Sequence, residues 1–256
     1  MDERVSETDV VWIMDAYSRY TIGKEPVEYI LGYVQFAGLQ FFVTPETIIP
    51  RPETEYMIEA VREFFASPKK SANDVILLDI GTWSGILGTA TLSHAHTYIQ
   101  KAYLTDRSPT ALEVAKKNVD TLLDDETKNK VTLLTCSLLD HPHLKTLFTT
   151  TSEILLVANL PYIPDEMFAN NADESITTRE PKMAFVGGDD GLDLYRQMFD
   201  QILLYRGEIE TSPLTMFLEM MTRQGKILAD AYQAYRIFEE VKTFHANIVI
   251  LKVTMK

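Results

Sequence analysis

The chain has 256 residues, 46% of them hydrophobic, and its 24 basic and 37 acidic side chains give a net charge of −13. This length allows one large domain, or one domain with a small appendage, and no apolar run reaches the roughly 18–20 residues of a membrane span. Nucleic-acid enzymes usually have a basic surface, so the acidic charge favours a protein or a small molecule as the substrate.

The first 49 residues predict a small N-terminal unit. Residues 1–32 are predicted to form short helices, and we expect Trp12, an apolar residue of the first helix, to lie in the core. Residues 33–49 predict a β-hairpin linker with Gly38 near its turn. Residues 50–256 are left for the main domain.

From residue 50 onward, predicted strands alternate with predicted helices. Ile49–Glu55 contains prolines and glutamates in the places typical of a helix start. The predicted strands are 75–79, 102–106, 131–134, 154–158, 216–219, 237–244 and 248–254, and the predicted helices are 56–65, 86–94, 109–123, 192–204 and 224–235. This alternation is typical of a parallel α/β sheet, and the last two strands predict an antiparallel hairpin added to its edge.

The segment Asp79–Gly85 joins the first strand of this sheet to its helix. Glycines at such a place let the backbone approach a ligand closely, beside the N-terminus of the helix. Asp106 ends the next strand, where a carboxylate can accept both hydroxyls of a ribose. Together these residues predict a site for an adenine-containing cofactor; the alternative is an ordinary strand–helix turn.

Trp83 stands in this loop where a middle glycine is the usual residue. A tryptophan adopts positive φ only at a cost, and its ring needs room. Two outcomes are open. The ring turns outward or stacks near the cofactor, and binding is retained; or it fills the pocket and prevents binding.

The tetrapeptide Asn159-Leu160-Pro161-Tyr162 follows an apolar predicted strand. The asparagine amide offers one acceptor and two N–H donors, and the proline holds Leu160 extended, so that the Leu160 carbonyl has a fixed direction. The tyrosine adds a flat ring. These groups can hold a planar –NH₂ group by both hydrogens; the alternative is a plain exit from a strand into a loop.

Six segments together resemble the glutamine-N5 methyltransferases that modify peptide-chain release factors, a family of class I S-adenosylmethionine enzymes. The segments are Glu25–Gly32 with Phe36, Ile49–Glu55, Asp79–Gly85, Asp106–Leu112, Asn159–Ile163 and Glu180–Leu192. The tetrapeptide alone is not specific, because DNA and RNA amino methyltransferases share the Asn-Pro-Pro-Tyr motif that it resembles. Ile49–Glu55 and Gly187–Leu192 are the more specific parts.

The resemblance implies a Rossmann-like class I methyltransferase fold, with a mostly parallel seven-stranded sheet and a methyltransferase domain over residues 50–256. It implies methyl transfer from S-adenosylmethionine to a glutamine side-chain amide in the Gly-Gly-Gln loop of a release factor. The Asn159 side-chain oxygen and the Leu160 carbonyl would accept the two amide N–H groups. By resemblance the catalytic residues are Asn159, Leu160, Pro161 and Tyr162, and the cofactor-binding residues are Asp79, Gly81, Thr82, Trp83, Ser84, Gly85, Asp106 and Asn159.

Three alternatives stay open. One is a glutamine methyltransferase for a ribosomal protein. A nucleic-acid amino methyltransferase would use the same tetrapeptide, although the net charge of −13 counts against it. A non-catalytic binding protein is favoured if Trp83 blocks the cofactor site. We expect no direct nucleic-acid partner and no membrane association.

Two features bear on metal binding and location. The His-x-His sequences at 94–96 and 141–143 lack supporting cysteines or obvious acidic partners, so we expect no metal site. The single cysteine, Cys136, excludes an internal disulfide and fits a reducing compartment, and the polar start Met1–Arg4 is unlike a secretion signal. We therefore expect a cytoplasmic protein.

Overall fold

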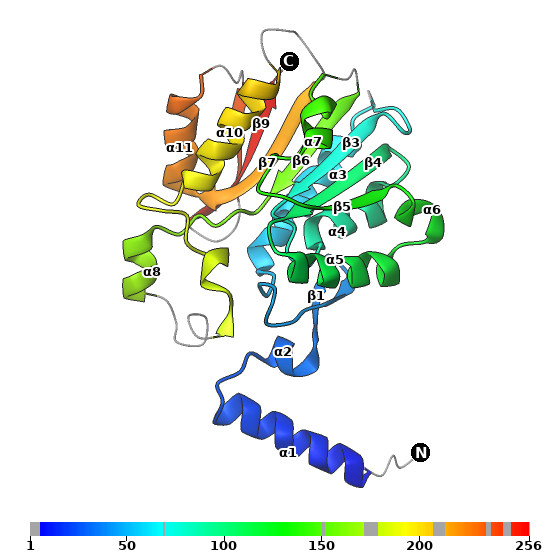
Figure 1. The fold of residues 1–256 in the computed structure, drawn as a ribbon, viewed down its shortest axis with the longest axis vertical. Coiled ribbons are helices and arrows are strands. Elements are labelled where there is room, and N and C mark those ends of the chain that lie inside the picture. Colours follow the sequence, from blue (N-terminus) through cyan, green and yellow to red (C-terminus); the bar gives the residue numbers. More distant parts are fainter. Residues whose placement is uncertain are drawn as a thin grey trace.

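The computed structural model describes residues 6–68, 70–149, 152–171, 179–206, 213–233, 237–242 and 247–255. A seven-stranded sheet with helices on both faces forms the body, and a hairpin and the N-terminal helix α1 lie at one end of it (Figure 1). The predicted ends of the helix 224–235 and of the strand 237–244 fall partly outside these ranges. Within them, no helix is both long and apolar enough to cross a membrane.

The sheet has the strand order β5-β4-β3-β6-β7-β9-β8. Strands β3 to β7 pair in parallel, whereas β9 runs antiparallel to both β7 and β8. The strands are β3 Val75–Ile80, β4 Ile99–Asp106, β5 Val131–Thr135, β6 Glu153–Ala158, β7 Leu214–Met221, β8 Ile237–Lys242 and β9 Ile248–Met255. The predicted fold class, with its antiparallel edge, is therefore confirmed.

The central strands β3, β6 and β7 are buried along nearly their whole length and consist mostly of apolar residues, because both faces of the sheet are covered. Along β3, Ile76, Leu78 and Ile80 lie in one core and Val75 and Leu77 in the other, as the period of two requires. Helices α7 Pro142–Leu147, α10 Asp193–Arg206 and α11 Thr222–Ala231 supply the first core, and α3 Glu55–Phe65, α4 Ile86–Ala95 and α5 Pro109–Leu122 supply the second.

The other elements either precede α3 or lie between these helices and strands, and all except α1 are too short to show a periodic sequence pattern. The acidic run at 124–126 is one example, since Asp124 caps the single-turn helix α6. The remaining elements are α1 Glu7–Thr21, α2 Val27–Leu31, β1 Tyr33–Phe36, β2 Leu39–Phe42, η1 Pro52–Thr54, α6 Asp125–Lys128, α8 Asp165–Asn171 and η2 Lys182–Ala184.

The hairpin β1–β2 turns at Ala37-Gly38, both with positive φ, and packs on the body of the protein. Phe36 and Phe41 are buried in the core that α3 and α4 supply. Asn118 of α5, also buried, accepts a hydrogen bond from the Phe42 N–H (2.7 Å) and donates to the carbonyls of Phe42 (3.0 Å) and Ser84 (2.8 Å). One asparagine thus joins the hairpin to the loop that follows β3.

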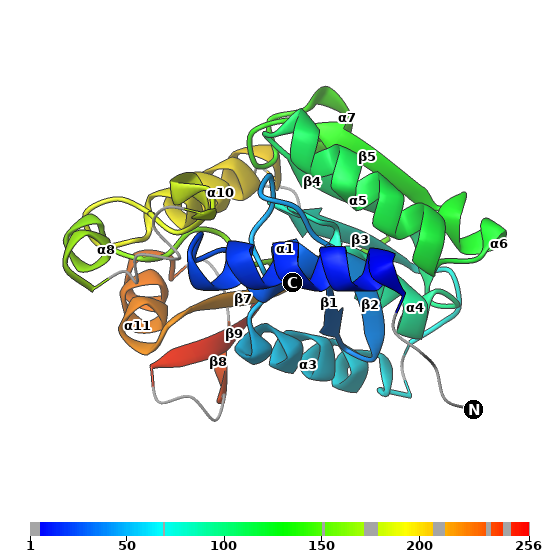
Figure 2. The same cartoon turned by 90° about the horizontal axis from the view of Figure 1, so that it is seen from below.

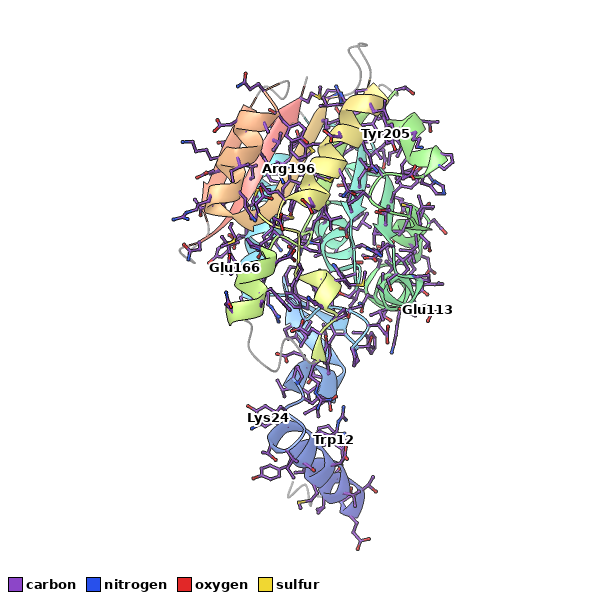
Figure 3. All side chains as sticks on the ribbon, turned by 60° about the vertical axis from the view of Figure 1, so that its left-hand side comes forward. Trp12, Lys24, Glu113, Glu166, Arg196 and Tyr205 are labelled. Carbon is purple, nitrogen blue, oxygen red and sulfur yellow. The ribbon has the colours of Figure 1, made fainter. Side chains whose placement is uncertain are left out.

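Helix α1 begins with a capping box between Ser6 and Asp9, but none of its residues is buried. Seen from below, α1 runs across the front of the domain (Figure 2), and Trp12 lies on the far part of the molecule, away from the sheet (Figure 3). Trp12 is 50% exposed. The prediction that it lies in the core is wrong, because the described part of the domain does not cover the apolar side chains of α1.

We predict that Asn118→Ala lowers the free energy of unfolding by about 2–4 kcal/mol, because the substitution leaves a donor and two acceptors of the backbone without their partner. Urea denaturation followed by circular dichroism measures this. The control is Asn129→Ala, at an exposed residue just after α6. Equal loss in the two variants would contradict the assigned role of Asn118.

Candidate active site

The carboxyl ends of β3, β4, β6 and β7 meet at one edge of the sheet. In the parallel register, Ile80 of β3 lies opposite Thr105 of β4 on one side and Ala158 of β6 on the other. After β3 the next two strands of the chain, β4 and β5, are added on one side of β3. The following strands, β6 and β7, are added on its other side. Between β3 and β6 the strand order therefore reverses, which is where open α/β sheets bind ligands.

Asp79 braces the loop after β3. Its Oδ2 accepts hydrogen bonds from the Thr82 hydroxyl (2.5 Å) and from the Gly88 N–H of α4 (2.8 Å). Its Oδ1 is buried without a hydrogen-bond partner among the described residues, as is the Ser84 hydroxyl. Complete burial raises the pKa of Asp79 to about 7, against the lowering effect of these hydrogen bonds.

Asp106, at the end of β4, binds the same loop. Its Oδ2 accepts from the Trp83 N–H and its Oδ1 from the Ser108 N–H, both at 2.9 Å. Burial raises the pKa of the Asp106 carboxyl, and the backbone donors oppose that rise. The predicted cofactor residues from 79 to 85 and Asp106 are therefore brought into one hydrogen-bonded unit.

The Trp83 ring lies inside this unit. The residue is only 8% exposed and packs with Ala111 and Ala184, with Ile48 and Phe185 at the margin. The ring is therefore not turned outward, whereas a ring that stacks near the cofactor and a ring that fills the pocket would both lie at this place. Two small cavities remain beside the ring, of about 60 and 20 Å³, and both are lined by Gly81 and Trp83.

The tetrapeptide after β6 is held by buried partners. An N–H of the Asn159 side-chain amide donates a hydrogen bond to the Thr54 hydroxyl (3.2 Å). The Leu160 N–H donates to the Tyr195 hydroxyl (3.2 Å), which itself donates to the Glu219 carbonyl (2.5 Å). A proline at position 160 would have no such N–H. Tyr195 therefore restrains Leu160, which stands where the Asn-Pro-Pro-Tyr motif has its first proline.

Glu219 of β7 is a site residue that the sequence analysis did not single out. It is 1% exposed, and its Oε1 accepts a hydrogen bond from the Tyr162 hydroxyl (3.0 Å). Burial raises the pKa of Glu219 to about 7, and hydrogen bonds from neighbouring side chains oppose this. The sequence feature that could have indicated Glu219 is a single acidic residue near the carboxyl end of an otherwise apolar strand.

A pocket of about 390 Å³ opens beside the tetrapeptide. Its polar lining includes Asn159, Tyr162 and Glu219, together with Arg51 and Glu53. The rest is mostly apolar: Ile48, Leu160, Ile163, Met167, Phe168, Ala184, Phe185, Met221 and Ile248, with Asn247 at the margin of β9. A largely apolar pocket with a few convergent polar groups is the usual form of a small-ligand site.

One ion pair joins two walls of this pocket. Arg51 Nη2 lies 2.7 Å from Glu180 Oε1, and the Ile49 N–H donates to the other oxygen at 3.0 Å. The Arg51 guanidinium also lies over the Phe185 ring, 5.7 Å from its centre. Residues 49–51 thereby hold the segment from Glu180 to Phe185 against the site.

Two curated relatives are similar to this chain over most of its length. The release factor glutamine methyltransferase of Moorella thermoacetica is 38% identical over 218 residues, which cover 82% of this chain and 68% of that protein. The protein of the same name from Bacillus anthracis is 34% identical over 184 residues, 69% of this chain and 58% of the relative. The chain belongs to the release factor glutamine methyltransferase family.

Two further findings concern the fold and the share of the relatives' length that this chain matches. The solved hMettl16 catalytic domain has a TM-score of 0.58 with 11% identity, covering 97% of this chain and 82% of that one, which supports the fold alone. No protein-family model matches the chain. The chain spans 58% of the length of the Bacillus anthracis relative and of the Koribacter versatilis one, so it matches only part of them.

The family implies S-adenosylmethionine, and the polar groups at the loop suit such a ligand. Asp79 Oδ1 and the Ser84 hydroxyl are buried polar atoms without partners, and their residues line the smaller cavity. Asp106 lines the larger one. The two cavities are too small for S-adenosylmethionine in this conformation, because each is far below the ~300 Å³ of typical ligand pockets.

We predict that Glu219→Gln makes this family member less sensitive to alkaline pH. A carboxyl whose pKa is raised by folding contributes stability that is complete below its unfolded pKa and is lost as the pH rises through about 7. The unfolding free energy of the variant relative to the wild type should therefore rise by about 3 kcal/mol between pH 4.5 and pH 8. Urea denaturation at both pH values measures the difference.

The control for this experiment is Glu113→Gln, at an exposed residue of α5 (Figure 3). It should leave the pH dependence unchanged. If Glu219→Gln follows the wild type at every pH, the carboxyl does not titrate in the folded protein as its burial requires.

Proposed function

We propose that the chain transfers a methyl group from S-adenosylmethionine to the side-chain amide nitrogen of a glutamine in a protein, in the Gly-Gly-Gln loop of a peptide-chain release factor. The observation that carries this proposal is the tetrapeptide Asn159–Tyr162, held at the wall of a 390 Å³ pocket in a chain of this family. The net charge of −13 further supports a protein substrate over a nucleic acid.

In this proposal, Asn159 and Leu160 orient the substrate amide. The Asn159 amide nitrogen is engaged by Thr54, which leaves the amide oxygen as the acceptor for one substrate N–H. The Leu160 carbonyl accepts the second, and Tyr162 provides the aromatic wall. Two fixed acceptors favour the positive charge that develops on the nitrogen, so they assist the transfer as well as the binding.

Thr54 and Tyr195 are positioning residues in the same proposal. Each bonds a member of the tetrapeptide, and each is buried. Pro161 contributes through the backbone, because it limits the directions that the Leu160 carbonyl can take. The nitrogen gains a methyl group and loses one proton, which water can accept.

The cofactor would be held at Asp79–Gly85 and Asp106. Gly81, Thr82, Ser84 and Gly85 form the loop, and Asp106 offers a carboxylate near the larger cavity. When bound, S-adenosylmethionine supplies the methyl group on a positively charged sulfur. Trp83 belongs to the same loop, and its ring packs against Ala111 and Ala184.

We assign residues 50–256 to the methyltransferase domain, 33–49 to a hairpin linker and 1–32 to a helical segment. The absence of buried residues in α1, within the part of it that is described, supports a separate segment at the N-terminus. Modification of release factors would give the chain a role in translation termination, in the cytoplasm where such factors act.

We predict that Asn159→Ala lowers methyl transfer by about 10²- to 10³-fold, the usual loss when one acceptor of a developing charge is removed. A release factor is incubated with the variant and S-adenosylmethionine, and mass spectrometry counts methyl groups on its Gly-Gly-Gln peptide. The exposed Asn129→Ala variant serves as the control and should act as the wild type does. Methylation of a ribosomal protein or of nucleic acid in place of the release factor would overturn the proposed substrate.

We predict that Tyr195→Phe lowers kcat with little change in KM, because it removes the hydroxyl that restrains the Leu160 N–H and leaves the pocket lining intact. A loss of about tenfold is expected for one hydrogen bond. Steady-state kinetics measure the two constants. Tyr20→Phe, on the exposed face of α1, is the matched control. An increase in KM alone would contradict a positioning role.

A further inference from the structure

The space above the cofactor loop is filled by the chain itself. The two cavities there, about 60 and 20 Å³, are small, although the neighbouring pocket at the tetrapeptide is about 390 Å³. Ligands the size of S-adenosylmethionine need roughly 300 Å³ or more. Among the described residues, the larger space therefore lies on the substrate side of the site and only small cavities lie on the cofactor side.

The Trp83 ring fills this space from the side of the loop. Its backbone has φ +51°, and its N–H donates to Asp106 at 2.9 Å, so the direction in which the side chain leaves the loop is fixed. The ring packs against Ala111 at the start of α5 and Ala184 of η2. The ring thus contacts both α5 and η2 from its place in the loop.

Leu160 fills the cleft from the side of β6. It is buried, and a side chain at Gly81 would lie only 2.8 Å from Leu160 Cδ2. Leu160 also lines both the larger of the two small cavities and the 390 Å³ pocket. The two positions at which this chain departs from its family's motifs therefore place apolar side chains in one space.

We propose that Trp83 is an internal plug of the cofactor cleft, so that S-adenosylmethionine binds only after the indole ring has left its place against Ala111 and Ala184. The proposal rests on the proposed function. Cofactor binding then includes the cost of exposing a buried ring, and the affinity is lower than that of the same cleft with glycine at position 83.

The plug also links the two parts of the site. Ala184 and Phe185, which pack on the ring, line the 390 Å³ pocket, and the Arg51–Glu180 ion pair holds their segment in place. Ile48 contacts the ring and lines the same pocket. Removal of the ring from the cleft therefore changes the wall of the substrate pocket.

Isothermal titration with S-adenosylmethionine tests the plug. The proteins are the wild type, Trp83→Gly, Trp83→Ala and the control Trp12→Ala, which removes the same ring from an exposed site on α1. We expect Trp83→Gly to bind at least tenfold more tightly than the wild type. Trp83→Ala should also bind more tightly, and Trp12→Ala should equal the wild type.

A second measurement does not depend on the folding of the Trp83 variants. The chain has two tryptophans, so in Trp12→Phe all indole fluorescence comes from Trp83. We expect saturating S-adenosylmethionine to shift this emission to longer wavelength, because the ring leaves an apolar environment. An unchanged emission with clear heat of binding would overturn the plug.

The outcomes separate the plug from the proposed function. Equal or weaker binding by Trp83→Gly, with a wild type that binds the cofactor, overturns the plug and leaves the proposed function standing. If Trp83→Gly binds the cofactor and the wild type does not, the plug is supported, and the ring then prevents binding altogether. Failure of every folded variant to bind overturns both the plug and the cofactor in the proposed function.

Discussion

Strands β3 and β6 lie side by side in parallel, with Ile80 opposite Ala158, and the site depends on this pairing. The strand order reverses here, so the loop after β3 and the tetrapeptide after β6 leave the sheet next to each other. They come so close that a side chain at Gly81 would collide with Leu160. Neither segment would form a site without the other.

Buried acids surround this point. Asp79, Asp106 and Glu219 are all nearly inaccessible, and burial raises the pKa of each carboxyl. Buried acids are costly, and hydrogen bonds from the loop and from Tyr162 offset part of that cost. A cluster of acids with raised pKa values is typical of a functional site, and here it coincides with the reversal of strand order.

The substrate side and the cofactor side of this site differ in how far they are prepared for a ligand. Asn159, Leu160 and Tyr162 are each fixed by a described partner beside an open pocket. The loop after β3 is held by the carboxylates of Asp79 and Asp106, but the Trp83 ring occupies the space beside it. A family member can thus retain the polar groups of a site while a single apolar side chain controls access to it.

The α/β class, the antiparallel hairpin at the edge of the sheet and the position of the tetrapeptide could be predicted from the amino-acid pattern, because buried parallel strands are continuous apolar runs. It did not reveal Glu219 as a site residue, since the nearness of β7 to Tyr162 is a tertiary contact. The prediction that Trp12 lies in the core was wrong for the same kind of reason, because the exposure of its side chain depends on which parts of the protein pack on α1. The position of the Trp83 ring could not be predicted from the sequence, because it depends on Ala111 and Ala184, which approach the loop from other parts of the chain.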